Sequence, residues 1–172
     1  MPSPVGHALG GVLTWALQNR WTGQAASRPS CVLLAGLAMA PDLDLLFDRH
    51  NGESHSLGAA ALVALAVFVV RRRGRARAPL ATAVAWALAC GGAYASHLLL
   101  DALGTDHAPP IGIMAFWPVS ATYVKLPIEL FPPVPRNPFS PRFWSGMPVA
   151  VVVECLTLGL GAVLVRAWRR GK

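Results

Sequence analysis

The chain has 172 residues, of which 54% are apolar and only 13% are charged, and its mean hydropathy is +0.47. A soluble domain carries about 25% charged residues, so the composition excludes a disordered chain, a coiled coil and an ordinary soluble domain. The net charge is +7, but the basic residues form short clusters between long apolar runs, which favours a membrane protein with no nucleic-acid partner.

Five apolar segments predict an all-α, polytopic membrane bundle that forms a single domain over residues 1–172. In chain order they are 5–19, 31–47, 56–70, 79–100 and 148–168. A helix needs about 20 residues to cross a bilayer, so the last two are predicted to span it outright. The third is short and is expected to borrow residues from its N-terminal flank. The first two contain Gly, Pro or polar residues and are expected to be short, tilted or broken helices.

Residues 104–147 separate the last two segments and hold nine of the fifteen prolines together with seven aromatic residues. Prolines prevent a regular span, and aromatic side chains favour the headgroup layer of a bilayer. This part of the chain is therefore predicted to form a cap on the outer leaflet, with a short interfacial helix near residues 122–130.

The positions of Lys and Arg predict the orientation, because cytoplasmic loops are enriched in them. Eleven of the fifteen lie at 20–28, at 71–77 or after 165, and the other four are Arg49, Lys125, Arg136 and Arg142. The N-terminus is therefore predicted outside and the C-terminus inside, in the cytoplasmic (inner) membrane. This topology also places all five histidines and all five aspartates at the outer side, with Glu53 and Glu129. Their gathering on one side predicts a site there.

Two pairs of residues in helical or membrane-flanking sequence are candidate metal ligands. His97 and Asp101 are four residues apart, which places both side chains on one helix face about 5–6 Å apart. A hydrogen bond at the helix end is the alternative interpretation. Asp42 and Asp44 follow Pro41, and carboxylates at membrane depth usually mark ligands or ion pathways. The alternative is that they cap the next turn.

Three histidines complete the candidate set. His50 and His55 flank an Asn-Gly turn at 51–52 that brings them toward each other. Glu53 lies beside them and is a candidate general base, or a first-turn acid that complements a helix dipole. His7 is a candidate ligand or a core histidine. Imidazoles with carboxylates favour zinc, with manganese or iron as alternatives, and a bound divalent metal would activate water.

The ordered set of these motifs resembles the YdjM-like family of inner-membrane proteins, to which metal-dependent hydrolysis is ascribed. The resemblance extends to about Tyr123 and rests on His7 to Gly10, Pro41-Asp42-Leu43-Asp44, Arg49-His50 to His55-Ser56, His97-Leu98-Leu99-Leu100-Asp101 and Trp117-Pro118-Val119-Ser120. The helical His-Asp pair is also similar to the zinc pattern of phospholipase C and P1-type nucleases. That similarity implies that Asp101 bridges two metals, with Asp42 or Asp44, His55 and His97 as further ligands and His7 nearby.

Two functions follow from these patterns. The first is a membrane-embedded metal-dependent hydrolase at the outer face, with Asp101 and Glu53 as catalytic residues, that cleaves a phosphoester in a lipid-linked or amphipathic substrate. The second is a non-enzymatic metal-binding membrane protein, such as a transporter, a sensor or a scaffold. An ion pathway needs polar residues through the inner halves of the spans, and those halves are almost purely apolar, which favours the enzyme.

Overall fold

The computed structural model describes residues 1–22, 27–47, 50–74, 77–135, 137 and 139–170. Within these ranges the helices form five continuous segments and no strand is present, which confirms the predicted all-α fold. They are α1 (Pro4–Thr22), α2 (Arg28–Met39) continuing into the 3-10 helix η1 (Ala40–Phe47), α3 (Leu57–Arg73), α4 (Leu80–Ala102), and α5 (Pro141–Glu154) continuing through one π-helical turn, η2 (Cys155–Gly159), into α6 (Leu160–Arg170).

Three helices in the described part of the chain are long and apolar enough to cross a membrane: Arg28–Phe47, Leu80–Ala102 and Pro141–Trp168. The last two correspond to the spans predicted at 79–100 and 148–168. The first contains the predicted segment 31–47 and begins three residues earlier, at Arg28, because Ser27 caps the first turn of α2. α3 has only 17 residues, so it falls short of the length that a full span needs.

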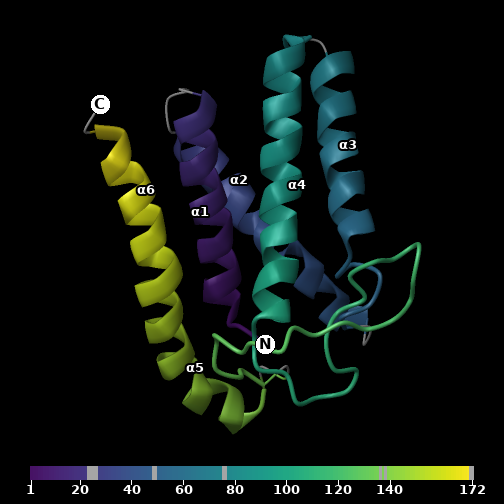
Figure 1. Ribbon diagram of the computed structural model, residues 1–172, viewed down its shortest axis with the longest axis vertical. Helices are drawn as coiled ribbons and strands as arrows, with labels where there is room; N and C mark the ends of the chain where they lie inside the picture. Colours follow the sequence, from purple (N-terminus) through teal and green to yellow (C-terminus); the bar gives the residue numbers. More distant parts are fainter. Residues whose placement is uncertain (23–26, 48–49, 75–76, 136, 138, 171–172) are drawn as a thin grey trace.

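α4 lies at the centre of the bundle, where it packs against α1, α2 and α3, while α6 covers the other side of α1 (Figure 1). The core between these helices contains Trp15, Leu34, Cys90 and Ala93. α1 and α2 approach closely at Gly11, since a Cβ there would lie 2.3 Å from the carbonyl oxygen of Leu34. This packing fixes α1 beside α4 and brings the N-terminal turns of α1 next to the C-terminal turns of α4.

The two ends of the bundle carry different parts of the chain (Figure 1). One end carries the C-terminal ends of α1, α3 and α6 with the arginines, and three arginines there stack on tryptophan rings: Arg20 on Trp168, Arg71 on Trp86 and Arg166 on Trp15. The opposite end carries the N-terminus, η1 and the segment between α4 and α5. Asp48, Arg49, Arg75, Arg136 and Lys172 lie outside the described residues.

The segment between α4 and α5 is irregular, as its prolines predict. Ile113 and Val124 form a short antiparallel backbone pair, and Gly104 pairs with Phe131. The interfacial helix predicted near 122–130 is wrong, because this stretch is extended at Val124 and Pro127 lacks the N–H that a helix would use. α5 also begins earlier than the predicted residue 148, since Ser140 caps its first turn.

Candidate metal centre

The seven predicted ligands come from four parts of the chain and lie at the same end of the bundle. α1 supplies His7 in its first turn, η1 supplies Asp42 and Asp44, and α4 supplies His97 and Asp101 in its last turns. His50 and His55 lie between η1 and α3. The turn predicted at 51–52 is present, with Asn51 in the left-handed region at φ 65°, and the rings of His50 and His55 are 4.9 Å apart.

His97 is oriented by the backbone of α2. Its Nδ1 lies 2.7 Å from the carbonyl oxygen of Ala38. A carbonyl only accepts hydrogen bonds, so Nδ1 carries a hydrogen, and Nε2 is the atom that the neutral ring offers to a metal. That Nε2 lies 3.1 Å from Asp101 Oδ2 and 3.4 Å from Asp42 Oδ1. A histidine held in this way by a backbone carbonyl is a common arrangement for a metal ligand.

Asp44 orients the two histidines of the loop. Its Oδ2 lies 3.0 Å from His55 Nδ1 and accepts a 2.6 Å hydrogen bond from the Ser54 hydroxyl, and its Oδ1 lies 3.0 Å from His50 Nδ1. Burial opposes protonation of His55, but the hydrogen bonds with Asp42 and Asp44 outweigh burial and raise its pKa above the ordinary value. The carboxylate of Asp44 therefore faces the two histidines, and its assignment as a direct ligand stays a prediction.

With Nδ1 of His55 turned to Asp44, its Nε2 faces the Nε2 of His97 at a distance of 3.0 Å. Two lone pairs at this separation repel each other unless a positive charge, from a proton or a metal ion, lies beside them. Asp101 Oδ2 lies 3.4 Å from His55 Nε2, so carboxylate and imidazole donors surround the same point.

His7 closes the site from α1. Its ring stacks on that of His97, with centroids 3.7 Å apart, and its Nε2 lies 3.5 Å from Asp101 Oδ1 and 4.0 Å from Asp42 Oδ2. The side chains of His7, His55 and His97 are completely buried, and Asp101 is 5% exposed. Among the candidate ligands the most exposed side chains are those of Asp42 and Asp44, at 17% and 11%.

Unpartnered polar atoms concentrate at this point. Among the described residues, seven buried side-chain N and O atoms lack a hydrogen-bond partner, and five of them belong to His7, Asp42 and Asp101. Four of these five atoms lie in contacts of 3.1–3.5 Å between an imidazole and a carboxylate, and these residues belong to a group that could hold a metal ion. Their types, imidazole nitrogen and carboxylate oxygen, fit a divalent metal ion.

The spacing of the donors also fits an ion. Bonds of about 2.0–2.2 Å from zinc to N or O place neighbouring ligand atoms about 3.0–3.6 Å apart. Two groups have one ligand atom per residue within 4.8 Å of one another: His7, Asp42, His97 and Asp101, and Asp42, His50 and His55. Asp42 is common to both groups, whereas the resemblance to phospholipase C implies Asp101 as the shared residue.

The first turn of α1 is anchored by Glu154 at the end of α5. The buried carboxylate accepts a 2.6 Å hydrogen bond from the backbone N–H of Ser3 and a second from the Ser3 hydroxyl. Gly6 makes room for it, because a Cβ at Gly6 would lie 2.5 Å from Glu154 Cδ. His7 follows immediately, so this contact fixes the position from which the His7 ring enters the site.

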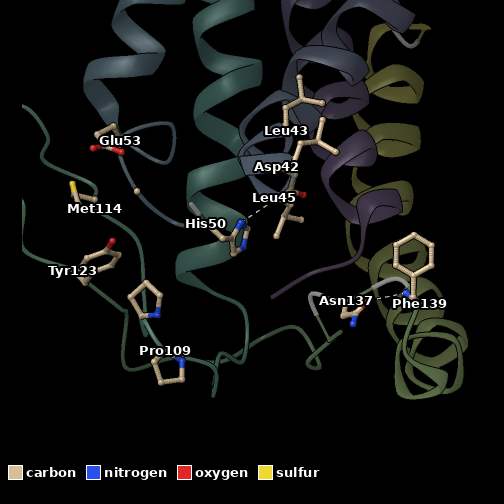
Figure 2. Close-up of a pocket in the computed structure, with 13 residues that line it drawn as sticks. Asp42, Leu43, Leu45, His50, Glu53, Pro109, Met114, Tyr123, Asn137 and Phe139 are labelled. Atoms are coloured by element: carbon tan, nitrogen blue, oxygen red, sulfur yellow. Dashed lines mark hydrogen bonds and ion pairs between the residues drawn. The ribbon is translucent and has the colours of Figure 1, made fainter. Parts of the chain in front are cut away.

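A cavity of about 990 Å³ lies beside the metal-binding residues (Figure 2). Asp42 and His50 line it, and its other walls are largely apolar, with Leu43, Leu45 and Phe139 among them. Figure 2 shows Glu53 on the wall of the cavity opposite Phe139, and Glu53 belongs to neither group of candidate ligands. The cavity gives a second molecule access to Asp42.

Several residues that orient the candidate ligands were not identified from the sequence. They are Ala38, which holds His97 through its carbonyl oxygen, Ser54, which bonds Asp44, and Tyr94, whose hydroxyl donates a 2.8 Å hydrogen bond to the carbonyl oxygen of Ser54. Tyr94 precedes His97 by three residues and therefore shares its helix face, which is the one signal that the sequence offers.

The comparisons with known proteins agree with this picture. The family model described as YdjM inner membrane protein matches residues 1–169, and the protein therefore belongs to that family. This match confirms the resemblance drawn from the motifs. No curated protein and no solved structure matches the chain.

Proposed function

We propose, starting from its membership in an inner-membrane family, that the protein is a metal-dependent hydrolase whose site lies at the outer face of the membrane. The observation that carries this proposal is the concentration of buried, unpartnered donor atoms of His7, Asp42 and Asp101 beside an open cavity. The imidazoles of His7 and His97 and these carboxylates approach one another to 3.1–3.5 Å without forming hydrogen bonds, which is the spacing of neighbouring ligands around one ion.

His7, Asp42, His97 and Asp101 would hold the ion, with His55 facing the same point and His50 completing a second group through Asp42. The mixed N and O donors favour zinc, with manganese or iron as alternatives. Such an ion, when bound, lowers the pKa of a coordinated water and neutralises charge that develops on a phosphoester.

The chain itself contributes orientation and a dry environment. Asp44 and the carbonyl of Ala38 hold the imidazoles of His55 and His97 with their Nε2 atoms toward the site. Burial of His7 and Asp101 excludes bulk water, which strengthens electrostatic interactions there. Glu53, on the wall of the cavity, is the candidate to accept a proton from the attacking water.

The surroundings of the cavity support a lipid-linked or amphipathic substrate. Its apolar wall includes Leu43 and Leu46, which are 60% and 77% exposed, and η1 belongs to a helix apolar enough to cross a membrane. The predicted orientation, with the N-terminus outside, places this end of the bundle at the outer leaflet. A substrate could then approach from the bilayer with its polar group toward Asp42.

Hydrolysis by purified protein in vesicles, measured against phosphoester and phospholipid substrates with and without added zinc, tests the proposal. We expect Asp101→Ala to abolish both activity and metal content, and Glu53→Gln to lower the rate while metal content stays unchanged. A protein that binds zinc stoichiometrically but hydrolyses no member of the panel, and instead moves zinc across vesicles, would favour the non-enzymatic alternative, a transporter.

A further inference from the structure

A second hollow, of about 430 Å³, lies on the other side of Asp42 from the cavity. It is formed where α2 and η1 pass the beginnings of α1 and α5. Apart from Asp42, its lining carries no charged side chain: Pro4, Gly36, Met39, Ala40, Leu43, Leu45 and Phe143. We call it the α2 groove. Its lining suits a hydrocarbon chain and no polar ligand.

Gly36 keeps the groove open. A Cβ at this position would meet nothing within 4 Å, so the space beside the glycine is free. Gly36, Met39 and Leu43 follow one another at helical spacing and share a face of α2–η1. Met39 and Leu43 are 38% and 60% exposed, and the helix is apolar enough to cross a membrane. This face therefore meets the hydrocarbon of the bilayer.

The α2 groove and the cavity share one wall. Asp42, Leu43 and Leu45 line both hollows, so a path from the apolar face of α2 to the polar cavity passes the carboxylate that both ligand groups include. A long apolar chain matches the groove, and an anionic headgroup matches the cavity when a metal ion offsets the carboxylates of Asp42 and Glu53 there. In a molecule that has both, the headgroup would lie toward the metal-binding residues, and the chain would lie along Gly36 and Met39.

From this continuity we infer that the α2 groove binds the hydrocarbon chain of a lipid phosphate drawn sideways from the bilayer. The inference deepens the proposed function and rests on it for the identity of the headgroup. It makes Gly36 a specificity-determining residue, because a larger side chain there would fill the groove without clashing with the fold.

The test uses the full-length protein in zinc-containing vesicles of phosphatidylcholine and phosphatidylglycerol with a long-chain alkylphosphonate, which has a P–C bond in place of the ester and carries a diazirine in its alkyl chain. After illumination, mass spectrometry maps the labelled residues. Labels are expected to concentrate on residues 36–45 and on Phe143. Gly36→Phe should lower this labelling about tenfold or more, as steric exclusion of a few methylenes from an apolar pocket does.

Gly159→Phe is the matched control, because a Cβ at Gly159 also meets nothing within 4 Å but the residue does not line the groove. It should leave the labelling unchanged. Gly36→Ala should give an intermediate loss, which keeps the test valid if the larger variant does not fold. A diazirine alcohol of the same chain length should label the groove less, because it lacks the anionic group.

Labels spread evenly over the exposed helices, or labelling that Gly36→Phe does not change, would overturn the inference. Hydrolysis is measured separately on the same samples, so groove labelling without hydrolysis would refute the proposed activity alone, and hydrolysis without groove labelling would refute the inference alone.

Discussion

His97 donates its Nδ1 hydrogen to the carbonyl oxygen of Ala38, at a distance of 2.7 Å and across 59 residues of sequence. The bond ties the last turns of α4 to the end of α2, where the helix tightens into η1. It also fixes which nitrogen of His97 is free. A backbone acceptor cannot be removed by mutation of a side chain, so the orientation of His97 depends on the packing of α2 against α4 and not on a neighbouring polar residue.

The first prediction concerns Asp101, whose buried carboxylate oxygens lie 3.1–3.5 Å from the Nε2 atoms of His7, His55 and His97. Asp101→Asn keeps the size of the side chain and removes its charge. We expect loss of bound metal and also a lower melting temperature of the metal-free protein, because the buried imidazoles lose the carboxylate that they pair with. Metal analysis and thermal unfolding with and without zinc measure both effects.

Glu129→Gln is the control for Asp101→Asn, since Glu129 is paired with Lys125 in the segment between α4 and α5 and lies in neither ligand group. It should bind metal as the original protein does. Full metal content in Asp101→Asn would remove Asp101 from the site.

The second prediction concerns Asp44, which holds His50 and His55 without belonging to either ligand group. Asp44→Asn should weaken metal binding about 10- to 100-fold, the usual effect of losing a residue that orients a ligand. Ser54→Ala should have a smaller effect, because it removes only one hydrogen bond to Asp44. Competition with a zinc chelator gives the affinities, and equal losses in Asp44→Asn and Asp101→Asn would make Asp44 a direct ligand.

The third prediction concerns how stability depends on pH. The stability that His55 gives the metal-free protein should fall as pH rises, whereas the extra stability given by bound zinc should increase. The pKa of His55 is raised by Asp42 and Asp44 against the effect of burial. A raised pKa in the folded state stabilises the metal-free protein below the unfolded-state pKa, and this contribution is lost as pH rises through the folded value. A metal ion binds only the neutral form of His55, so the stabilisation of the protein by zinc should increase over the same rise in pH.

Melting temperatures between about pH 6 and 9, with zinc and with a chelator, measure this difference. His55→Gln should abolish the pH dependence that His55 contributes to the metal-free protein. Zinc stabilisation that is constant over the whole range would contradict a role for His55 in binding.

The sequence predicted that the five helical segments exist, but it predicted less well where they begin. Apolar runs located all five segments because burial in a bilayer requires them. The start of α5 was misplaced by seven residues, since the predicted segment began with the apolar run at Pro148, whereas the helix begins at Pro141, whose missing N–H costs nothing in the first turn. The helix expected at 122–130 was wrong because the backbone of Val124 bonds Ile113, a pairing that local sequence does not encode.

In the site too, features that depend on neighbouring residues were predicted, whereas features that depend on the packing of distant segments were not. The spacing of His97 and Asp101, and the turn between His50 and His55, follow from local geometry and were predicted. The turning of Asp44 toward His50 and His55 depends on how η1 meets the following loop. The sharing of Asp42 by two ligand groups depends on the packing of α1 and α4 against η1, and no spacing along the chain specifies it.

The fourth prediction is the orientation in the membrane. The arginine-rich end of the bundle is expected in the cytoplasm and the end with the metal-binding residues outside. In a protein whose native cysteines are replaced, an impermeant thiol reagent applied to intact cells should modify His107→Cys and not Arg73→Cys. Both positions are exposed, so accessibility in the fold does not decide the result. The reverse pattern would place the site in the cytoplasm.

The last prediction concerns the anchor of α1. Glu154 accepts two hydrogen bonds from Ser3, and Gly6 packs directly against its carboxylate. Gly6→Ala should displace the first turn of α1, because its Cβ would lie 2.5 Å from Glu154 Cδ, and this displacement carries His7 away from Asp101. Glu154→Gln keeps the size and one accepting oxygen, so it should disturb the turn less than Glu154→Ala, which leaves the Ser3 donors unpaired at a cost of about 1–3 kcal/mol.

If Glu154 acts on the site through His7, the loss of metal affinity should be smallest in Glu154→Gln, larger in Glu154→Ala and largest in Gly6→Ala. The double variant Gly6→Ala with Glu154→Ala relieves the clash and should bind metal better than Gly6→Ala alone. Cobalt substitution reports the ligand set, because its visible absorption changes when an imidazole is lost from the metal. A cobalt spectrum that is identical in all four proteins, despite lower melting temperatures, would show that the anchor stabilises the fold without positioning His7.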